Sequence, residues 1–346
     1  MDNDYLIAET ACSHNGNVKE LKRLIRRVSK TKVNIIKFQI FYPEERTFKG
    51  DDEYDLFHRL SLNQTEWSSA IKLARYHKLK IFADIFGHKS FNLAKKLKVD
   101  GFKIHNEDSS NYNFVKKILD EEKPTFVSIS GFENKELENV IKKYKNYQNF
   151  IPTIGFQNFP TAVDDHNLKE IQILKNAYPY LNVCYTDHIS CKKLNLSKKF
   201  PSYAFLSGAD YCEKHIAPEL NKKYEDFESA VLPEHLNEVL NYYNKIKTFS
   251  SFNSKKFQSS LDYRKKFKKF YFYKKNFKKG HKVTARDLCL RKFKLFNLPS
   301  NVNLSLGKLL KDVNKNDYVS KNHFKRNKVG IVILSRSLFK RFPLKY

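Results

Sequence analysis

Hydrophobic and polar positions in the first 247 residues alternate in blocks that predict eight strand-then-helix units. The predicted strands are mostly continuous apolar runs, which is typical of parallel strands buried on both faces. The segment 18–30 instead places Leu21, Leu24, Ile25 and Val28 at helical spacing on one face, and similar patterns follow other strands. The predicted strands cover residues 6–8, 34–40, 80–85, 101–105, 125–130, 150–156, 182–188 and 209–215.

A helix follows each predicted strand, and a long loop precedes the second of these helices. We expect Thr65 to be the N-cap of that helix, because its hydroxyl can accept a hydrogen bond from a free first-turn N–H. Eight units in this length predict an α/β fold, a (β/α)8 TIM barrel, whose functional groups sit at the carboxyl ends of the strands. A doubly wound open sheet is the alternative. The predicted helices include residues 18–30, 65–78, 90–98, 112–122, 135–145, 167–177 and 233–247.

The chain changes character after the predicted barrel, which we place at residues 1–247. Residues 248–263 are rich in Ser, Lys, Asn and Phe and are predicted to form a linker. Short β-like runs then alternate with turn residues, as at Lys278-Lys279-Gly280, and predict a small β-rich domain at residues 264–323. We assign the remaining residues, 324–346, to a basic tail.

The net charge of +28 is concentrated in the C-terminal part of the chain. From Thr248 to Tyr346, 27 Lys and Arg stand against 4 Asp and Glu, so the first 247 residues carry only five of the net positive charges. A block this basic can bind nucleic acid or another anionic surface. The whole chain is rich in Lys and Asn, however, so many of these lysines are expected to be solvated surface. Polyanion binding through this region stays an alternative, and we expect neither nucleic acid nor a membrane as the main partner.

Cysteine use and hydropathy bear on the compartment. No apolar run reaches the roughly 18 residues of a transmembrane helix. The acidic start, Met1-Asp2-Asn3-Asp4, lacks the basic-then-apolar pattern of a secretory signal. The five cysteines are scattered and odd in number, and no zinc-type CxxC pair is present. We therefore expect reduced thiols and a cytoplasmic location.

Two histidines end the last two predicted strands in matching positions. His188 follows the run 182–187, and His215 follows the run 209–214. Parallel strands would deliver both imidazoles to the same edge of the sheet, where they are suitable ligands for a divalent transition metal. Two unrelated strand-end histidines are the alternative. A metal held there could polarise a carbonyl oxygen as a Lewis acid.

Lysines end two other predicted strands and point to an anion site. Lys37 and Lys103 would place two ammonium groups in one pocket, which suits a phosphate or carboxylate. The alternative is that either lysine merely pairs with a carboxylate such as Glu9 or Asp108. The residues alone therefore suggest a metal-assisted reaction between an anionic, perhaps phosphorylated, partner and a carbonyl compound. Side chains that could add hydrogen bonds to the anion or to a sugar are Glu9, Asn106, Asp108, Ser128, Ser130 and Asp226.

The order of the motifs resembles that of the sialic acid (N-acetylneuraminate) synthase family over residues 5–323. Ile7–Gly16 resembles the family's opening IAEIGxNHNG, and Ile36–Gln39 resembles its VKFQ. Residues 277–291 resemble the antifreeze-like (SAF) domain that ends these synthases. Further matches are Phe102-Lys103-Ile104 with Asp108 and Asn111, Phe159-Pro160-Thr161, Thr186-Asp187-His188 and Glu213-Lys214-His215.

The resemblance implies a condensation of phosphoenolpyruvate with an N-acylated amino sugar, N-acetylmannosamine or a relative, with release of phosphate. His188 and His215 would hold a divalent metal, expected to be manganese, with magnesium or cobalt as alternatives, and Glu9 and Gln39 would complete the catalytic set. The SAF domain implies a domain-swapped homodimer in which Arg291 reaches the partner's site. The implied substrate-binding residues are Lys37, Lys103, Asn106, Asp108, Ser130, Gln157, Asp187, Asp226 and Arg291.

The departures from the family pattern cluster around the phosphate and sugar pockets. Asp84 stands where the family has a threonine, and a carboxylate there would repel phosphate unless it were paired or protonated. Asn106 and Ile129 each replace a serine, and Gln157 replaces an asparagine. These departures are consistent with a related nonulosonic acid synthase that uses a different sugar acceptor, and a divergent member with altered chemistry is the alternative. A sugar-acid aldolase or lyase that works without phosphoenolpyruvate stays an alternative on the same barrel.

Overall fold

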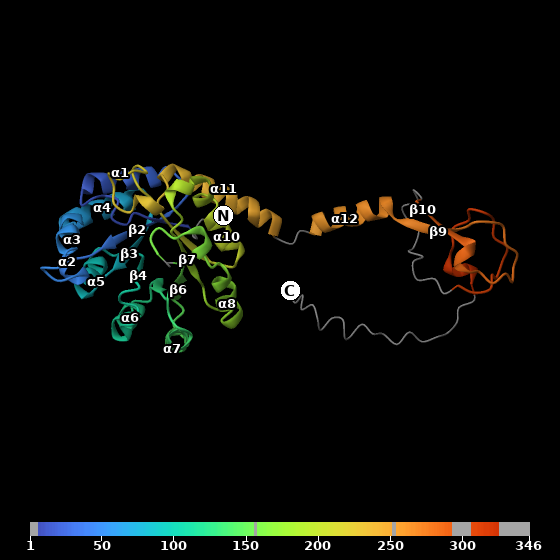
Figure 1. Ribbon diagram of the computed structural model, residues 1–346, viewed down its shortest axis with the longest axis horizontal. Coiled ribbons are helices and arrows are strands. Elements are labelled where there is room, and N and C mark those ends of the chain that lie inside the picture. The colour runs from blue at the N-terminus through green and yellow to red at the C-terminus, as the bar shows by residue number, and fades with distance from the viewer. Residues whose placement is uncertain (1–5, 156–157, 251–253, 293–305, 325–346) are drawn as a thin grey trace. The chain divides into compact units, whose positions relative to one another are not determined.

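The computed structural model describes residues 6–155, 158–250, 254–292 and 306–324. In its first unit, residues 1–251, eight parallel strands pair in chain order and close into a barrel (Figure 1). Closure is made by β8 against β1, which sets Glu9 opposite His215. The predicted (β/α)8 barrel is confirmed, and the open sheet is excluded. The strands are β1 (Leu6–Glu9), β2 (Ile35–Ile40), β3 (Lys80–Ile85), β4 (Gly101–Ile104), β5 (Thr125–Ser128), β6 (Phe150–Ile154), β7 (Cys184–Asp187) and β8 (Tyr211–His215).

Helices surround the barrel and bury their apolar faces against the outward-facing side chains of the strands. In α1 (Val18–Val28), for example, the four apolar residues of the predicted face are all buried, as the helical spacing required. One continuous apolar cluster joins the strands to the helices. The remaining outer helices are α4 (Gln64–Tyr76), α5 (His88–Lys96), α6 (Tyr112–Leu119), α7 (Asn134–Tyr144), α8 (Lys169–Ala177), α9 (Leu194–Ser197), α10 (Phe200–Leu206) and α11 (Leu236–Ser250).

Inside the barrel the side chains change from apolar to polar along each strand. Successive residues of a strand point to opposite faces, so every second side chain faces inward. Near the amino ends of the strands, the inward residues pack into an apolar cluster made of Ile7, Ile35, Phe82, Phe126, Ile151 and Cys184. Two residues further along, the same strands carry Glu9, Lys37, Asp84, Ser128, Thr153 and Thr186. The apolar layer thus closes the bottom of the barrel and supports a polar layer above it.

Three local expectations differ from the structure. The predicted loop after β2 contains two short helices, α2 (Pro43–Arg46) and α3 (Tyr54–Leu60). Thr65 is not the N-cap of α4: Asn63 takes this position, its side chain accepts the Glu66 N–H at 3.0 Å, and the Glu66 carboxylate accepts the Asn63 N–H at 2.9 Å. This reciprocal capping box satisfies two free donors, which a threonine two residues later cannot do. The predicted helix at 233–247 is a 3-10 turn (Pro233–His235) followed by α11.

The second unit comprises residues 252–346 and is described for 254–292 and 306–324. It contains α12 (Ser254–Phe267) and an antiparallel pair, β9 (Lys269–Tyr273) and β10 (Leu288–Lys292), so the predicted linker holds the end of α11 and most of α12. Its small apolar core is made of Tyr273, Val283, Leu288, Leu309, Val313, Val319 and Phe324.

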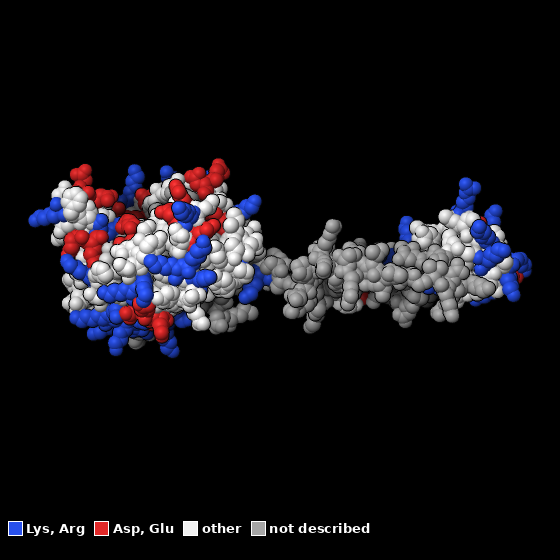
Figure 2. All heavy atoms as spheres, turned by 90° about the horizontal axis from the view of Figure 1, so that it is seen from below, with Lys and Arg blue, Asp and Glu red and all other residues white. Residues whose placement is uncertain are grey.

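The two units differ in charge. In the described ranges of the second unit, 19 Lys and Arg stand against four Asp and no Glu. The barrel unit shows Lys, Arg, Asp and Glu side chains interspersed on the same face in Figure 2. No helix in the described ranges is both long and apolar enough to cross a membrane.

The capping box generates a prediction for the barrel's stability. Asn63→Ala removes the acceptor that holds the first turn of α4, so we expect the free energy of unfolding to fall by about 1 kcal/mol. Trp67, the single tryptophan of the chain, is buried on this helix, and its fluorescence during denaturant unfolding reports the barrel unit. Thr65→Ala is the matched control and should leave the midpoint almost unchanged; a larger loss for Thr65→Ala than for Asn63→Ala would contradict the capping assignment.

Candidate active site

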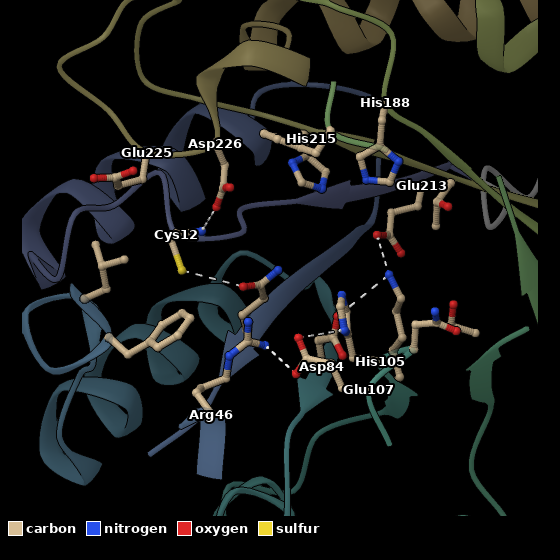
Figure 3. Close-up of a pocket in the computed structure, with 18 of the residues that line it drawn as sticks. Cys12, Arg46, Asp84, His105, Glu107, His188, Glu213, His215, Glu225 and Asp226 are labelled. Carbon is tan, nitrogen blue, oxygen red and sulfur yellow. Dashed lines mark hydrogen bonds and ion pairs between the residues drawn. The ribbon is translucent and has the colours of Figure 1, made fainter. Parts of the chain in front are cut away.

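The polar layer inside the barrel is organised around one carboxylate, that of Glu213 on β8. Its Oε2 accepts a hydrogen bond from Lys37 Nζ at 2.6 Å, and its Oε1 accepts one from Lys103 Nζ at 2.8 Å. All three side chains are buried. A single glutamate therefore ties β8 to β2 and β4 across the barrel. Figure 3 shows Glu213 on the cavity wall below His188.

Two further carboxylates share the same lysines. Glu9 Oε2 lies 2.8 Å from Lys37 Nζ, while its Oε1 accepts the Ala11 N–H at 2.6 Å. Asp84 Oδ2 lies 3.7 Å from both Lys37 Nζ and Lys103 Nζ. Lys37 thus pairs with Glu9, one of the two carboxylates that the alternative interpretation named. We call Glu9, Lys37, Asp84, Lys103 and Glu213 the charged floor.

Burial and mutual attraction shift the pKa values of the charged floor. Burial opposes ionisation of Glu213, but the positive charges of Lys103 and Lys37 overcome it and hold the pKa of this carboxyl well below its usual range. Burial also lowers the pKa of Lys103, yet Glu213 and Asp84 raise it overall. For Lys37, burial dominates and lowers the pKa to about 8, with Lys103 adding to the effect. Glu213 therefore stays ionised, and Lys103 is the firmly charged partner.

The two histidines lie together above the charged floor, as the matching strand ends predicted. The ring centroids of His188 and His215 are 4.9 Å apart, and the Phe159 ring centroid lies 5.8 Å from each. Burial, followed by the neighbouring His215, lowers the pKa of His188 well below its ordinary value. Burial also lowers the pKa of His215 to about 3. Both imidazoles are therefore neutral at pH 7, which is the form of imidazole that binds metal ions.

This pair fits a divalent transition metal by its chemistry. Neutral imidazole nitrogen is a common metal ligand, and buried Nδ1 of His215 has no hydrogen-bond partner among the described residues. Within those residues, no group of three or more His, Cys, Asp or Glu side chains gathers as metal ligands. If His188 and His215 were the protein ligands of a metal, its other positions would be available to substrate or water, as in catalytic sites.

A buried ion pair lies behind the histidines. Lys214 Nζ donates to Asp187 Oδ2 at 2.9 Å, and both side chains are fully buried. The other aspartate oxygen accepts the Ile189 N–H at 2.9 Å. Asp187 therefore does not face the cavity, although the sequence suggested it for substrate binding. It instead fixes the strand ends that carry His188 and His215.

A cavity of about 620 Å3 opens above the charged floor. Figure 3 shows the two histidines at one end of it and Glu225 and Asp226 towards the other. Asp226 Oδ2 accepts the Cys12 N–H at 2.8 Å, and its backbone is left-handed, with a φ of 59°. Burial raises the pKa of Asp226. The end of the cavity away from the two histidines is therefore acidic and can accept hydrogen bonds from hydroxyl or amide groups. We call it the distal acidic end.

Arg46 on α2 lines the cavity from the loop after β2. Its guanidinium carbon lies 4.0 Å from the Phe86 ring centroid and 4.6 Å from that of Phe57, and its Nη1 lies 3.3 Å from Glu107 Oε2. Stacking between two rings fixes the plane of the guanidinium. Its buried Nε has no hydrogen-bond partner among the described residues. Arg46 is thus a positioned donor on the cavity wall.

The structure places the predicted residues in three groups. Gln39, Lys103, Asn106, His188, His215 and Asp226 line the cavity. Glu9, Lys37, Asp108, Ser130 and Asp187 are not among its lining residues. Ser128, which was expected together with Ser130, does line the cavity, and Glu107 lines it where Asp108 was expected. Arg291 lies on exposed β10 of the second unit, and Gln157 lies outside the described residues.

Several lining residues were missed by the sequence reasoning. Arg46, Glu53 and Phe57 belong to a segment interpreted as a loop, and a short helical pattern with Pro43 at the first position was the signal that could have revealed it. Glu107 and Glu225 are acidic residues next to the predicted Asp108 and Asp226. Glu107 lines the cavity in place of Asp108, whereas Glu225 lines it together with Asp226.

Comparison with known proteins places this geometry in a family. A protein-family model described as the NeuB family matches residues 24–255, which is more than half of the chain. The chain belongs to the NeuB family. Pseudaminic acid synthase of Campylobacter jejuni is 27% identical over 241 residues, covering 64% of this chain and 67% of that one. N,N'-diacetyllegionaminic acid synthase of Legionella pneumophila is 21% identical over 327 residues, covering 88% and 90%.

Solved structures agree on the fold of this NeuB-family chain. The N-acetylneuraminic acid synthetase of Leptospira borgpetersenii superposes with a TM-score of 0.68 at 23% identity, covering 76% of this chain and 92% of that one. Relatives of this kind are named acid synthases. At the level of the family, the protein is an enzyme that condenses phosphoenolpyruvate with a sugar and forms a carbon–carbon bond.

The charged floor generates a prediction for stability. Lys37→Met leaves Glu9, Asp84 and Glu213 with Lys103 as their single cation, so we expect a loss of about 3–5 kcal/mol, the usual cost of an uncompensated buried charge. Trp67 fluorescence during denaturant unfolding measures it. The control is Lys116→Met, which removes an exposed lysine paired with Asp120 and should cost less than about 1 kcal/mol. Equal losses would mean that the floor's charges are not mutually dependent.

Proposed function

We propose that this protein is a nonulosonic acid synthase that joins phosphoenolpyruvate to an N-acylated amino sugar, N-acetylmannosamine or a relative, and releases phosphate. One observation carries the proposal: on β8, Glu213 holds two buried lysines while His215, two residues on, meets the second neutral imidazole. Anion-binding and metal-binding groups are thereby set side by side at the carboxyl end of one strand. The free cysteines fit action in the reducing cytoplasm.

The lysines and the cavity wall would bind and orient phosphoenolpyruvate. Lys37 and Lys103 would exchange part of their contact with Glu213 for the phosphate and carboxylate oxygens, and Ser128 would donate a further hydrogen bond. Two fixed contacts would hold the enolpyruvate C3 towards the histidine pair. Such positioning lowers the barrier by removing the entropy cost of bringing the two reactants together.

His188 and His215 would hold a divalent metal, with manganese, magnesium and cobalt as candidates. When bound, the metal would supply Lewis-acid polarisation of the open-chain sugar aldehyde. C3 of phosphoenolpyruvate forms the bond to the aldehyde carbon, whose oxygen takes a proton. Water adds at C2, and phosphate leaves with its bridging oxygen as the C2–O bond breaks. Glu9, beside Lys37, and Gln39, on the cavity wall, would hold the sugar and the water.

The distal acidic end of the cavity would hold the sugar. Asp226 and Glu225 would offer carboxylate oxygens to hydroxyl and amide groups, and the Arg46 guanidinium would donate to an acyl oxygen. Leu56, Phe57 and Leu60 add an apolar wall that suits an acyl or deoxy methyl group. These features favour an uncharged acylated sugar.

We extend the proposal to the second unit. Residues 264–323 would act as a SAF domain that serves a partner subunit in a domain-swapped homodimer, with Arg291 entering the partner's site. The resemblance of residues 277–291 supports this, and Arg291 is exposed on β10. Asn106, on the loop after β4, lines the cavity and would contact the substrates, and Asp108 and Ser130 would support them from the loops after β4 and β5. The role proposed for Gln157 from the sequence falls outside the described residues.

A sugar-acid aldolase or lyase is the second candidate, because carboxylates already engage both lysines. It would turn over its sugar acid without phosphoenolpyruvate and would release no phosphate.

The reaction itself is tested by phosphate release from phosphoenolpyruvate with manganese present, across N-acylated hexosamines and their 6-deoxy diamino relatives. We expect release with at least one sugar and a loss of at least about 100-fold in rate for His215→Ala. Manganese binding, measured separately by electron paramagnetic resonance, should weaken in the same variant. His166→Ala is the matched control, because His166 is a histidine of the barrel unit outside the cavity lining. If folded, metal-loaded protein released no phosphate with any sugar, this result would contradict the proposed function.

The acidic end of the cavity predicts discrimination against charged sugars. A 6-phosphate ester of the working acceptor should show a kcat/KM at least about tenfold lower, or roughly 1.4 kcal/mol, because its charge would face Glu225 and Asp226. Glu225→Lys should narrow the gap, and the distant surface variant Glu138→Lys should not. Preference for the phosphate ester in the unmodified protein would contradict this account of the distal end.

A further inference from the structure

Asp84 is the least satisfied member of the charged floor. It is fully buried on β3, and Figure 3 shows it at the base of the cavity. Neither of its carboxylate oxygens accepts a hydrogen bond from the described residues. Its nearest cations, Lys37 Nζ and Lys103 Nζ, are each 3.7 Å away and already donate to Glu213. Asp84 is therefore a carboxylate inside the proposed anion site, with spare hydrogen-bonding capacity.

The net charge of the charged floor opposes the binding of an anion. Three carboxylates face two ammonium groups, which leaves one net negative charge when all five are ionised. An anion that contacts both lysines comes within a few ångströms of Asp84. Two like charges about 4 Å apart repel strongly in a partly buried site, where water screens them less than in bulk solution. Binding that leaves Asp84 ionised would therefore be weak.

We propose that Asp84 takes up a proton when an anion binds the charged floor, so that phosphoenolpyruvate enters together with one proton. This inference rests on the proposed function for the identity of the anion. The added proton cancels the repulsion and turns Asp84 into an O–H donor towards an oxygen of the anion. Two acidic groups that cannot both stay ionised at close range share a proton in this way.

The contacts of the other two carboxylates explain why the proton goes to Asp84. Each oxygen of Glu213 accepts a hydrogen bond from a lysine, and Glu9 accepts the Ala11 N–H as well as facing Lys37. Hydrogen bonds to a carboxylate stabilise its ionised form. Asp84 has none from the described residues, so its protonation breaks no hydrogen bond.

Other groups around Asp84 define the competing proton acceptors. Lys37, whose pKa burial lowers to about 8, would also gain a proton on anion binding in alkaline solution. A test must therefore separate Asp84 from Lys37. The charged and titratable groups that face Asp84 are Cys12 after β1, Lys37 on β2, Lys103 on β4, His105 and Asp108 after β4, and, through the lysines, Glu9 and Glu213.

The experiment is calorimetric binding of phosphoenolpyruvate to the full chain, with magnesium present, between pH 7.5 and 9. Buffers with different ionisation enthalpies give the number of protons taken up. We expect about one proton per ligand and an affinity that falls about tenfold per pH unit in the unmodified protein. In Asp84→Asn the affinity should be higher at pH 8.5, the uptake should be lost and the pH slope should flatten. Asp226→Asn, another buried aspartate of the same cavity, should keep the slope and the uptake.

Each outcome separates the possibilities. A flat pH profile in the unmodified protein overturns the inference. The same uptake in Asp84→Asn also overturns it and assigns the proton to Lys37. Asp84→Ser provides a second variant without the acid, and Trp67 fluorescence confirms that each variant is folded. Phosphate release without proton uptake would contradict the role of Asp84 but not the proposed function. Proton-linked binding without phosphate release with any sugar would contradict the proposed function but not the role of Asp84.

Discussion

The bridge from Glu213 to Lys37 and Lys103 is the interaction on which the rest of the site depends. A charge buried inside a barrel is tolerated only when it is paired and hydrogen-bonded. Glu213 meets this condition for two lysines at once, with contacts of 2.6 and 2.8 Å. Because its partners lie on β2 and β4, the side chains of three strands are fixed together. The cavity above them is therefore built on a rigid base.

The same buried charges set the state of the histidines. His215 follows Glu213 by two residues on β8, so both face the barrel interior. Burial and the nearby lysines keep both imidazoles neutral, while Asp187 and Lys214 neutralise each other behind them. Because neighbouring residues of a strand face opposite ways, β8 carries two separate ion-pair groups. Glu213 pairs with the lysines inside the barrel, and Lys214 pairs with Asp187 on the other face. The inner group surrounds the proposed anion site, and the outer group holds the strand ends in place.

Sequence reasoning could find the strand ends but not the direction of every side chain. Long apolar runs define buried parallel strands, so the positions of Lys37, Lys103, His188 and His215 followed from the pattern. Asp187 was misplaced because neighbours on a strand face opposite ways, and the pattern gives no phase when both faces are apolar. On the loop after β4, Glu107 lines the cavity and Asp108 does not, because the side chains of neighbouring residues also point in different directions there. Arg46 and the cap at Asn63 depend on local hydrogen bonds and stacking that hydrophobic periodicity does not register.

The depth of a residue determines how freely it can change. Glu107 and Glu225 are exposed, and water there screens a lost or reversed charge, so substitutions at these two positions can alter the acceptor at little cost in stability. The charged floor has no such freedom, because each of its groups faces another at short range away from water. A carboxylate at Asp84 can therefore persist only with both lysines beside it. Its presence changes the conditions under which an anion binds, while the fold that carries it stays the same.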